Sequence, residues 1–197
     1  MARSPAPSLR VGVLALQGGF APHADHLRAL GHRPSLIRSA RDVDALEGIV
    51  LPGGESTTQL SLLAREPGLR DALEATVRGG IPLLATCAGL ILAAREVEPL
   101  QSSFGWIDVG VRRNAWGRQL DSAEAVADDG TPLVLIRAPR ILRVGAGVSV
   151  EATLDGEPVL VRQGSRWGAT FHPELTRQTS LHARAFGDPR GAREGSA

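Results

Sequence analysis

The residues most able to do chemistry begin with the single cysteine, Cys87, in the segment Thr86-Cys87-Ala88-Gly89. An apolar run over 81–85 precedes it and helical spacing follows it, and a sharp strand-to-helix turn aims its central side chain out of a sheet. A helix N-terminus beside the sulfur favours the thiolate, and the N–H of Ala88 would point at a developing oxyanion. Because a lone cysteine is more often a small buried hydrophobic residue, the segment indicates a nucleophile only if a base accompanies it.

The candidate base is His172, in Phe171-His172-Pro173-Glu174, which follows an apolar run over 167–171. Residues two apart share one face of an extended segment. Glu174 can therefore lie beside the imidazole, fix its tautomer and stabilise the imidazolium. Alone, this segment is equally a polar turn with a surface histidine. Together with Cys87 it predicts a nucleophile, base and orienting carboxylate in the order Cys87, His172, Glu174.

A glycine-rich turn follows another apolar run, in Leu51-Pro52-Gly53-Gly54-Glu55-Ser56-Thr57-Thr58. The glycines let backbone N–H groups approach a ligand closely, and Ser56 or Thr57 can cap the helix that follows. This suits the second half of an oxyanion hole. No Gly-Lys-Ser/Thr sequence follows, so a nucleotide phosphate site is not expected. A plain strand-to-helix turn is the alternative.

Two polar insertions, Arg113-Asn114 and Ile136-Arg137, follow apolar segments of the second half. Guanidinium groups and an amide can hold the carboxylate of an amino acid, although solvated surface arginines show the same spacing. Gln17 lies at the end of the first apolar run, the position at which open α/β sheets bind their ligands. The alternative is that it is a loop residue without a functional role.

Two further histidines, His23 and His26, are three residues apart on an expected helix and so share a face. No acidic or cysteine ligand is spaced to join them, and we expect no metal site and no cofactor.

Fully apolar runs alternate with segments of helical spacing in the first half of the chain. The runs expected as strands are 11–16, 34–38, 48–51 and 81–85, and the segments expected as helices are 23–30, 56–65, 69–78 and 88–95. This alternation predicts an α/β fold with a mostly parallel sheet and helices on both faces.

The second half has expected strands joined by tight turns, which predicts an antiparallel extension of the sheet. These strands are 106–112, 132–136, 148–154, 158–162 and 167–171, and a helix over 176–186 would close the domain.

Length and composition bound the class of protein. The 197 residues, 43% hydrophobic and 22% charged, fit one soluble domain, expected over 9–187 with loose termini at 1–8 and 188–197. The net charge of +1 gives no reason to expect nucleic acid. All 22 basic residues are arginine, which excludes a lysine nucleophile. One cysteine, no apolar leader and no run long enough to span a membrane together indicate the cytoplasm.

These segments together resemble the class I glutamine amidotransferase family, and most nearly its glutaminase subunits of pyridoxal 5′-phosphate synthase. The resemblance extends from Val11 to Thr176. It is carried by the segments above and by Gly12-Val13-Leu14-Ala15-Leu16-Gln17-Gly18, Arg113-Asn114-Ala115-Trp116-Gly117-Arg118-Gln119, Asp121-Ser122, Ile136-Arg137-Ala138-Pro139 and Phe171-His172-Pro173-Glu174-Leu175-Thr176.

The resemblance implies a flavodoxin-like fold and a role for each matching residue. Cys87 would be the nucleophile, completed by His172 and Glu174. The residues implied in L-glutamine binding are Gly54, Glu55, Ser56, Arg113, Ile136 and Arg137, and Gly53, Ala88 and Gln17 would support the oxyanion or the partner side of the site.

The resemblance also implies a function in a complex. The chain would hydrolyse L-glutamine to glutamate and ammonia and pass the ammonia to a synthase subunit for vitamin B6 biosynthesis. The sequence departs from the usual pattern at four positions: Pro22, Ala85, Trp116 and Ala123. None belongs to the expected triad. A free-standing cysteine hydrolase acting on γ-glutamyl peptides, and a non-enzymatic regulator of a partner, are the alternatives.

Overall fold

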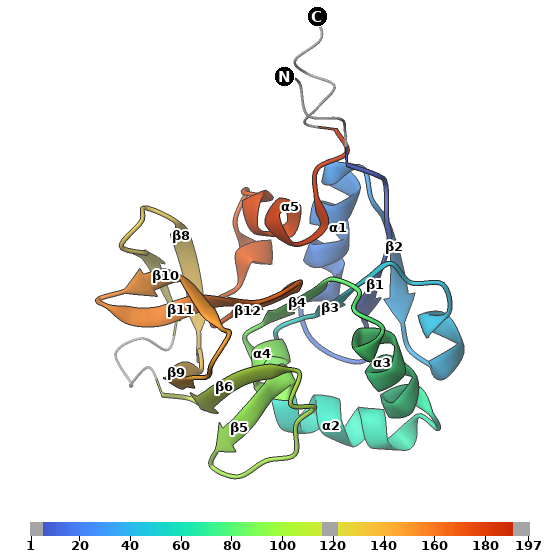
Figure 1. Ribbon diagram of the computed structural model, residues 1–197, viewed down its shortest axis with the longest axis horizontal. Coiled ribbons are helices and arrows are strands. Elements are labelled where there is room, and N and C mark those ends of the chain that lie inside the picture. The colour runs from blue at the N-terminus through green and yellow to red at the C-terminus, as the bar shows by residue number, and fades with distance from the viewer. Residues whose placement is uncertain (1–5, 116–121, 191–197) are drawn as a thin grey trace, which may run out of the picture.

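The computed structural model describes residues 6–115 and 122–190. A seven-stranded sheet lies at its centre, in the order β10-β11-β12-β4-β3-β1-β2 (Figure 1). In that order the strands are Ser149–Leu154, Glu157–Gln163, Arg166–Ala169, Leu83–Thr86, Gly48–Leu51, Arg10–Leu14 and Arg33–Ile37. The strands from β12 to β2 are parallel, and β10 and β11 add an antiparallel edge. The predicted parallel sheet with an antiparallel extension is confirmed.

Helices cover both faces of this sheet, as predicted. Helices α1 (Phe20–Leu30) and α5 (Ser180–Phe186) lie on one side, and α2 (Ser56–Arg65), α3 (Leu69–Arg78) and α4 (Ala88–Ala93) on the other (Figure 1). Alternation along β3 explains the arrangement, because successive side chains of a strand point to opposite faces. Ile49 and Leu51 join the core under α2 and α3, whereas Val50 joins the core under α1 and α5.

Two small sheets flank the antiparallel edge and were only partly foreseen. One contains β5 (Ala94–Glu98), β6 (Ile107–Arg112) and β9 (Arg140–Val144), and the other is the hairpin of β7 (Ser122–Val126) and β8 (Pro132–Ile136). The sequence analysis predicted neither β5, β7 nor β9. The helix expected over 88–95 ends at Ala93, because Ala94 turns to an extended conformation and β5 pairs with β6. Tertiary pairing there overrides the helical preference of Ala-Arg-Glu.

The ends of two other helices also differ from the prediction. Helix α1 begins at Phe20, three residues before the expected start, and holds Pro22 in its first turn, where a missing N–H costs nothing. The helix expected over 176–186 begins only at Ser180, and a 3-10 turn, Pro173–Leu175, precedes it. A further 3-10 turn, Ala40–Val43, links β2 to β3.

Parts of the chain near both termini contact the end of α1. Ser8 Oγ donates a hydrogen bond to the Gly31 carbonyl (2.7 Å), and Arg190 Nη1 donates one to the Ala29 carbonyl (3.1 Å). The rest of the expected loose termini lies outside the described residues, at 1–5 and 191–197. So does the segment 116–121, which carries part of the resemblance. Within the described residues, no helix is long and apolar enough to cross a membrane.

The close approach of α4 to β3 gives a test of the fold. A Cβ at Gly89 would collide with the backbone carbonyl of Leu51, so we expect Gly89→Ala to lower the free energy of unfolding by about 1–3 kcal/mol. Urea denaturation measures the change. Gly79→Ala, at an exposed helix end with φ −65°, is the matched control and should leave stability nearly unchanged. Equal effects of the two variants would contradict this account of the packing.

Candidate active site

The candidate site lies where four parallel strands end. Chain segments leaving the carboxyl ends of β1, β3, β4 and β12 meet there, at the point where the strand order reverses between β1 and β3. They enclose a cavity of about 250 Å³, near the lower end of the range for small-molecule sites. Its lining residues are Gln17, Gly54, Glu55, Ser56, Cys87, Ile91, Arg113, Asn114, Ile136, Arg137 and His172.

Cys87 occupies the predicted turn between β4 and α4. Its backbone has φ 47° and ψ −107°, a conformation that costs a non-glycine residue about 1–3 kcal/mol. The turn is held by the Cys87 N–H, which donates to the Ala169 carbonyl of the neighbouring strand β12 (2.9 Å). Only 5% of Cys87 is exposed, at the floor of the cavity. Ala88 opens the helix, so its N–H has no partner within that helix.

His172 follows β12 and lies against the glycine turn after β3. Its Nδ1 is 2.7 Å from Glu174 Oε1, and both side chains are almost fully buried. Burial alone lowers the pKa of His172, but the hydrogen bonds and charges of Cys87 and Glu174 outweigh it and raise the pKa to about 10. A Cβ at Gly53 would overlap the imidazole ring. The arrangement therefore favours an imidazolium facing Cys87, with a carboxylate behind it.

Charged side chains form the opposite wall of the cavity. Glu55 caps α2, and its pKa is lowered to about 2, first by the Thr57 hydroxyl and also by hydrogen bonds from Thr58 that outweigh its partial burial. Arg113 Nη2 lies 3.3 Å from Glu55 Oε1. Gln17 Oε1 accepts a hydrogen bond from the Glu55 N–H (2.9 Å). A cavity with both charges on one wall suits a zwitterion such as an amino acid.

The remaining wall comes from the segments after β6 and β8. Arg137 and Asn114 have positive φ angles of 45° and 50°. Cys87 Sγ lies 3.8 Å from the Ile136 carbonyl oxygen. Ile91, one turn into α4, also lines the cavity, and the sequence analysis missed it because nothing separates it from an ordinary core residue.

The structure thus brings together most of the residues that the sequence singled out. Gln17, Gly54, Glu55, Ser56, Cys87, Arg113, Ile136, Arg137 and His172 line one cavity. The other three, Gly53, Ala88 and Glu174, do not line it. Gly53 and Glu174 instead contact the ring of His172, and Ala88 adjoins Cys87 in the chain.

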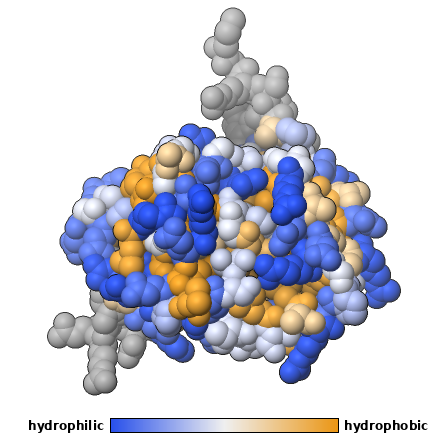
Figure 2. All heavy atoms as spheres, turned by 60° about the horizontal axis from the view of Figure 1, so that its bottom comes forward, coloured by the Kyte–Doolittle hydropathy of each residue, from blue (hydrophilic) through white to orange (hydrophobic). Residues whose placement is uncertain are grey.

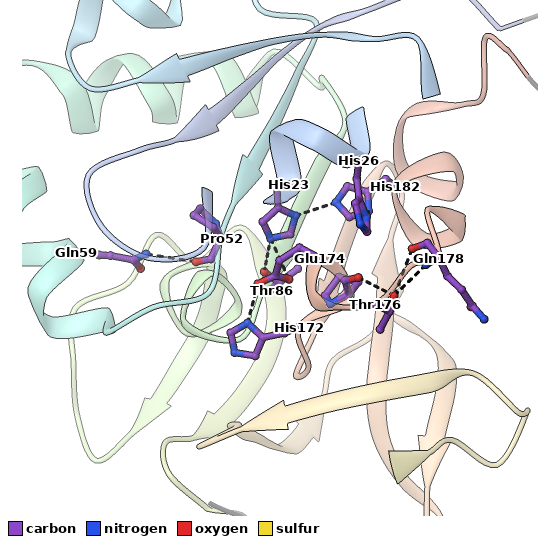
Figure 3. Close-up of polar contacts among 11 residues, drawn as sticks. His23, His26, Pro52, Gln59, Thr86, His172, Glu174, Thr176, Gln178 and His182 are labelled. Atoms are coloured by element: carbon purple, nitrogen blue, oxygen red, sulfur yellow. Dashed lines mark hydrogen bonds and ion pairs between the residues drawn. The ribbon is translucent and has the colours of Figure 1, made fainter. Parts of the chain in front are cut away.

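Three histidines lie behind the site as a connected cluster (Figure 3). His23 Nδ1 is 2.8 Å from His182 Nε2, and His26 Nδ1 is 3.3 Å from His182 Nδ1. The sequence placed His23 and His26 on one helix face but gave no signal that His182 would join them. Among the described residues, no group of three or more histidine, cysteine, aspartate or glutamate side chains is arranged to hold a metal ion.

Comparisons with known proteins agree with one another. A family model, the SNO glutamine amidotransferase family, matches residues 13–186. The chain is 46% identical over 180 residues to the pyridoxal 5′-phosphate synthase subunit PdxT of Koribacter versatilis, covering 88% of this chain and 92% of that protein. It is 44% identical over 183 residues to the protein of the same name from Bifidobacterium longum, with 87% and 96% covered. A solved crystal structure of a glutamine amidotransferase is 41% identical, with a TM-score of 0.83 over 92% of this chain and 98% of that one.

The buried histidines predict a stability that depends on pH. Burial first, and then the charges of His26 and His32, lower the pKa of His182 to about 3, and burial also lowers the pKa of His23. The unfolded chain takes up these protons below about pH 6.5, whereas the folded one does not. Below pH 6.5 the neutral His182 and His23 therefore lower the free energy of unfolding, whereas above this pH they have no such effect. The loss continues as the pH falls toward 3 and is at most about 1.4 kcal/mol per pH unit for each group.

Urea denaturation at pH 7.5 and pH 5.5, compared between the unchanged protein and a variant, isolates this loss, because the raised pKa of His172 adds a change of opposite sign to both proteins. We expect His182→Leu to lose less stability between the two pH values than the unchanged protein, because one of the groups no longer titrates. An identical loss in both proteins would show that His182 is not held neutral in the folded state.

Proposed function

We propose a function from one premise: this chain belongs to the SNO glutamine amidotransferase family. It hydrolyses L-glutamine to glutamate and ammonia, as the glutaminase subunit of a pyridoxal 5′-phosphate synthase. The observation that supports this most directly is the meeting of Cys87 and His172 in one small cavity with charges of both signs.

Substrate binding follows from the charges of the cavity wall. Arg113 and Arg137 hold the α-carboxylate of glutamine in this proposal, and Glu55 its α-ammonium group, which their common position in the cavity lining supports. Gly54, Ser56 and Ile136 complete the contacts around the substrate. Without substrate, the ionised Glu55 pairs with Arg113. When glutamine binds, its ammonium group takes the place of Arg113 beside Glu55, and its carboxylate takes the place of Glu55 beside Arg113.

The chemistry proceeds through a thioester. The Cys87 thiolate attacks the side-chain amide carbon, and the oxyanion is held by the N–H of Ala88 and one from the Gly53-Gly54 turn. The imidazolium of His172 gives its proton to the amide nitrogen as the C–N bond breaks and ammonia leaves. His172 then takes a proton from water, which attacks the thioester, and glutamate and the thiolate are released. Glu174 stabilises the imidazolium throughout.

A synthase subunit is the proposed receiver of the ammonia, which would otherwise be lost to solvent. Large hydrophobic side chains are exposed at Leu100, Val126, Leu142, Val150 and Leu175. The face in Figure 2 shows hydrophobic patches interrupted by hydrophilic residues, a surface on which a protein partner can dock. We place the complex in the cytoplasm, where a lone cysteine stays reduced, and assign the activity to one domain over 9–187.

Ammonia release from L-glutamine tests this function, measured for the chain alone and with the synthase subunit. We expect activity that rises strongly when the synthase is added, and a loss of at least about 10⁴-fold in Cys87→Ala. Thermal denaturation should show that the variant stays folded. Turnover retained by Cys87→Ala would refute the nucleophile. Activity that the synthase does not change would indicate a free-standing hydrolase instead. A chain that binds the synthase but releases no ammonia would indicate a non-enzymatic regulator.

A further inference from the structure

The two oxygens of the Glu174 carboxylate have different surroundings. Oε1 accepts from His172 Nδ1, while Oε2 has no aligned hydrogen bond and has His23 Nε2 at 3.2 Å. The side chains of Glu174 and His23 are 1% and 0% exposed, so bulk solvent does not reach Oε2. A Cβ at Gly19 would lie 2.9 Å from Oε1, which shows how tightly the carboxylate is enclosed. A buried carboxylate oxygen without a donor is costly, and His23 is placed to supply one.

The direction of the contact between His23 and Glu174 sets the direction of the other contacts among the three histidines. An ionised carboxylate only accepts, and each neutral imidazole has one N–H and one lone pair. If His23 presents Nε2–H to Glu174, its Nδ1 must accept from His182 Nε2–H. Then His182 Nδ1 must accept from His26 Nδ1–H. In this orientation the histidine chain, His26 to His182 to His23, donates toward Glu174 at every link.

A second acceptor competes for the same proton. His23 Nε2 also lies 3.2 Å from Thr86 Oγ1, the residue before the nucleophile. The reverse orientation, in which Thr86 donates to His23, would leave Oε2 of a buried carboxylate without any donor. The orientation toward Glu174 gives the buried Oε2 a donor, and a charged acceptor left without a donor costs more than a hydroxyl left without one.

We propose that His23 is a positioning residue for glutamine hydrolysis: it donates Nε2–H to Glu174 Oε2 and so holds Oε1 against His172, while His182 and His26 fix its tautomer. The proposal rests on the proposed function. Three elements come together for it, since His23 belongs to α1, His182 to α5 and Glu174 to the 3-10 turn after β12 (Figure 3).

The charge of His23 matters as much as its place. Burial first, and then the neighbouring His182, His26 and His172, hold the pKa of His23 well below its ordinary value. A neutral donor orients the carboxylate but leaves its negative charge available to the imidazolium of His172. A charged His23 would instead compete with His172 for Glu174. The histidine chain thus supplies a hydrogen bond without an opposing charge.

The test compares His23→Leu, which removes the donor, with His23→Gln, whose amide keeps one. The matched control is His32→Leu, a second buried histidine that bonds to the Leu9 N–H and the Gly187 carbonyl, away from the cavity. The measurements are kcat and KM for glutamine with the synthase subunit present, the pH profile of kcat, and the pH profile of Cys87 alkylation by iodoacetamide.

We expect His23→Leu to lower kcat by about 10-fold or more, the scale on which outer hydrogen-bond partners act in enzyme sites, with KM nearly unchanged. The basic limb of the pH profile should move to lower pH, because a displaced Glu174 raises the pKa of the His172 imidazolium less. His23→Gln should recover most of kcat. His32→Leu should lower the melting temperature and leave both pH profiles in place.

Three results would overturn the proposal: a His23→Leu profile like that of the unchanged protein, no rescue by His23→Gln, or equal effects of His23→Leu and His32→Leu. If His23→Leu does not fold, His182→Leu replaces it, and a kcat and alkylation profile unaltered in that variant counts against the proposal. An inactive unchanged protein would refute the proposed function instead, while the alkylation profiles would still decide the role of His23.

Discussion

The parallel pairing of β4 with β12 is the constraint on which the candidate site depends. Thr86 lies opposite Ala169 in this register, and the Cys87 N–H donates to the Ala169 carbonyl. One hydrogen bond therefore links the turn that carries Cys87 to the strand that leads to His172. A shift of one residue in this pairing would turn the side chains of β12 to the opposite face and would carry His172 away from the sulfur. The long excursion of the chain between these strands, through the two small sheets, supplies Arg113, Ile136 and Arg137 to the same cavity.

The local turns that position the candidate residues were predictable from short stretches of sequence. The Cys87 turn needs small neighbours, the glycine turn needs close backbone approach, and His172 and Glu174 need only two-residue spacing. Each requirement is met within a few consecutive residues, so each leaves a mark in the sequence. The parallel sheet was predictable for a similar reason, because strands such as β3 must be apolar on both faces to lie between two layers of helices.

What the sequence did not predict depends on contacts between distant segments. Strand β5 exists because β6 offers it hydrogen bonds, and its own residues favour a helix. His23 and His182 are separated by most of the chain, and their contact arises only because α1 and α5 pack on the same face of the sheet. A pair of histidines on one helix face gave no sign of this role, since the third histidine and the carboxylate that they approach lie far away in the sequence.

In the proposed role of the histidine chain, the layer formed by α1 and α5 both covers the sheet and positions Glu174. A wholly apolar layer would stabilise the fold more. Histidines that are neutral when buried lower the free energy of unfolding at acid pH, because the unfolded chain binds protons that the folded chain does not. Glu174, however, is buried on the same side, and in the proposed mechanism it serves His172 as a carboxylate. An apolar neighbour would leave Oε2 of this carboxylate without a donor, and an arginine would neutralise its charge. A neutral imidazole avoids both effects, which gives a physical reason for histidine, and not leucine or arginine, at the rear of this site.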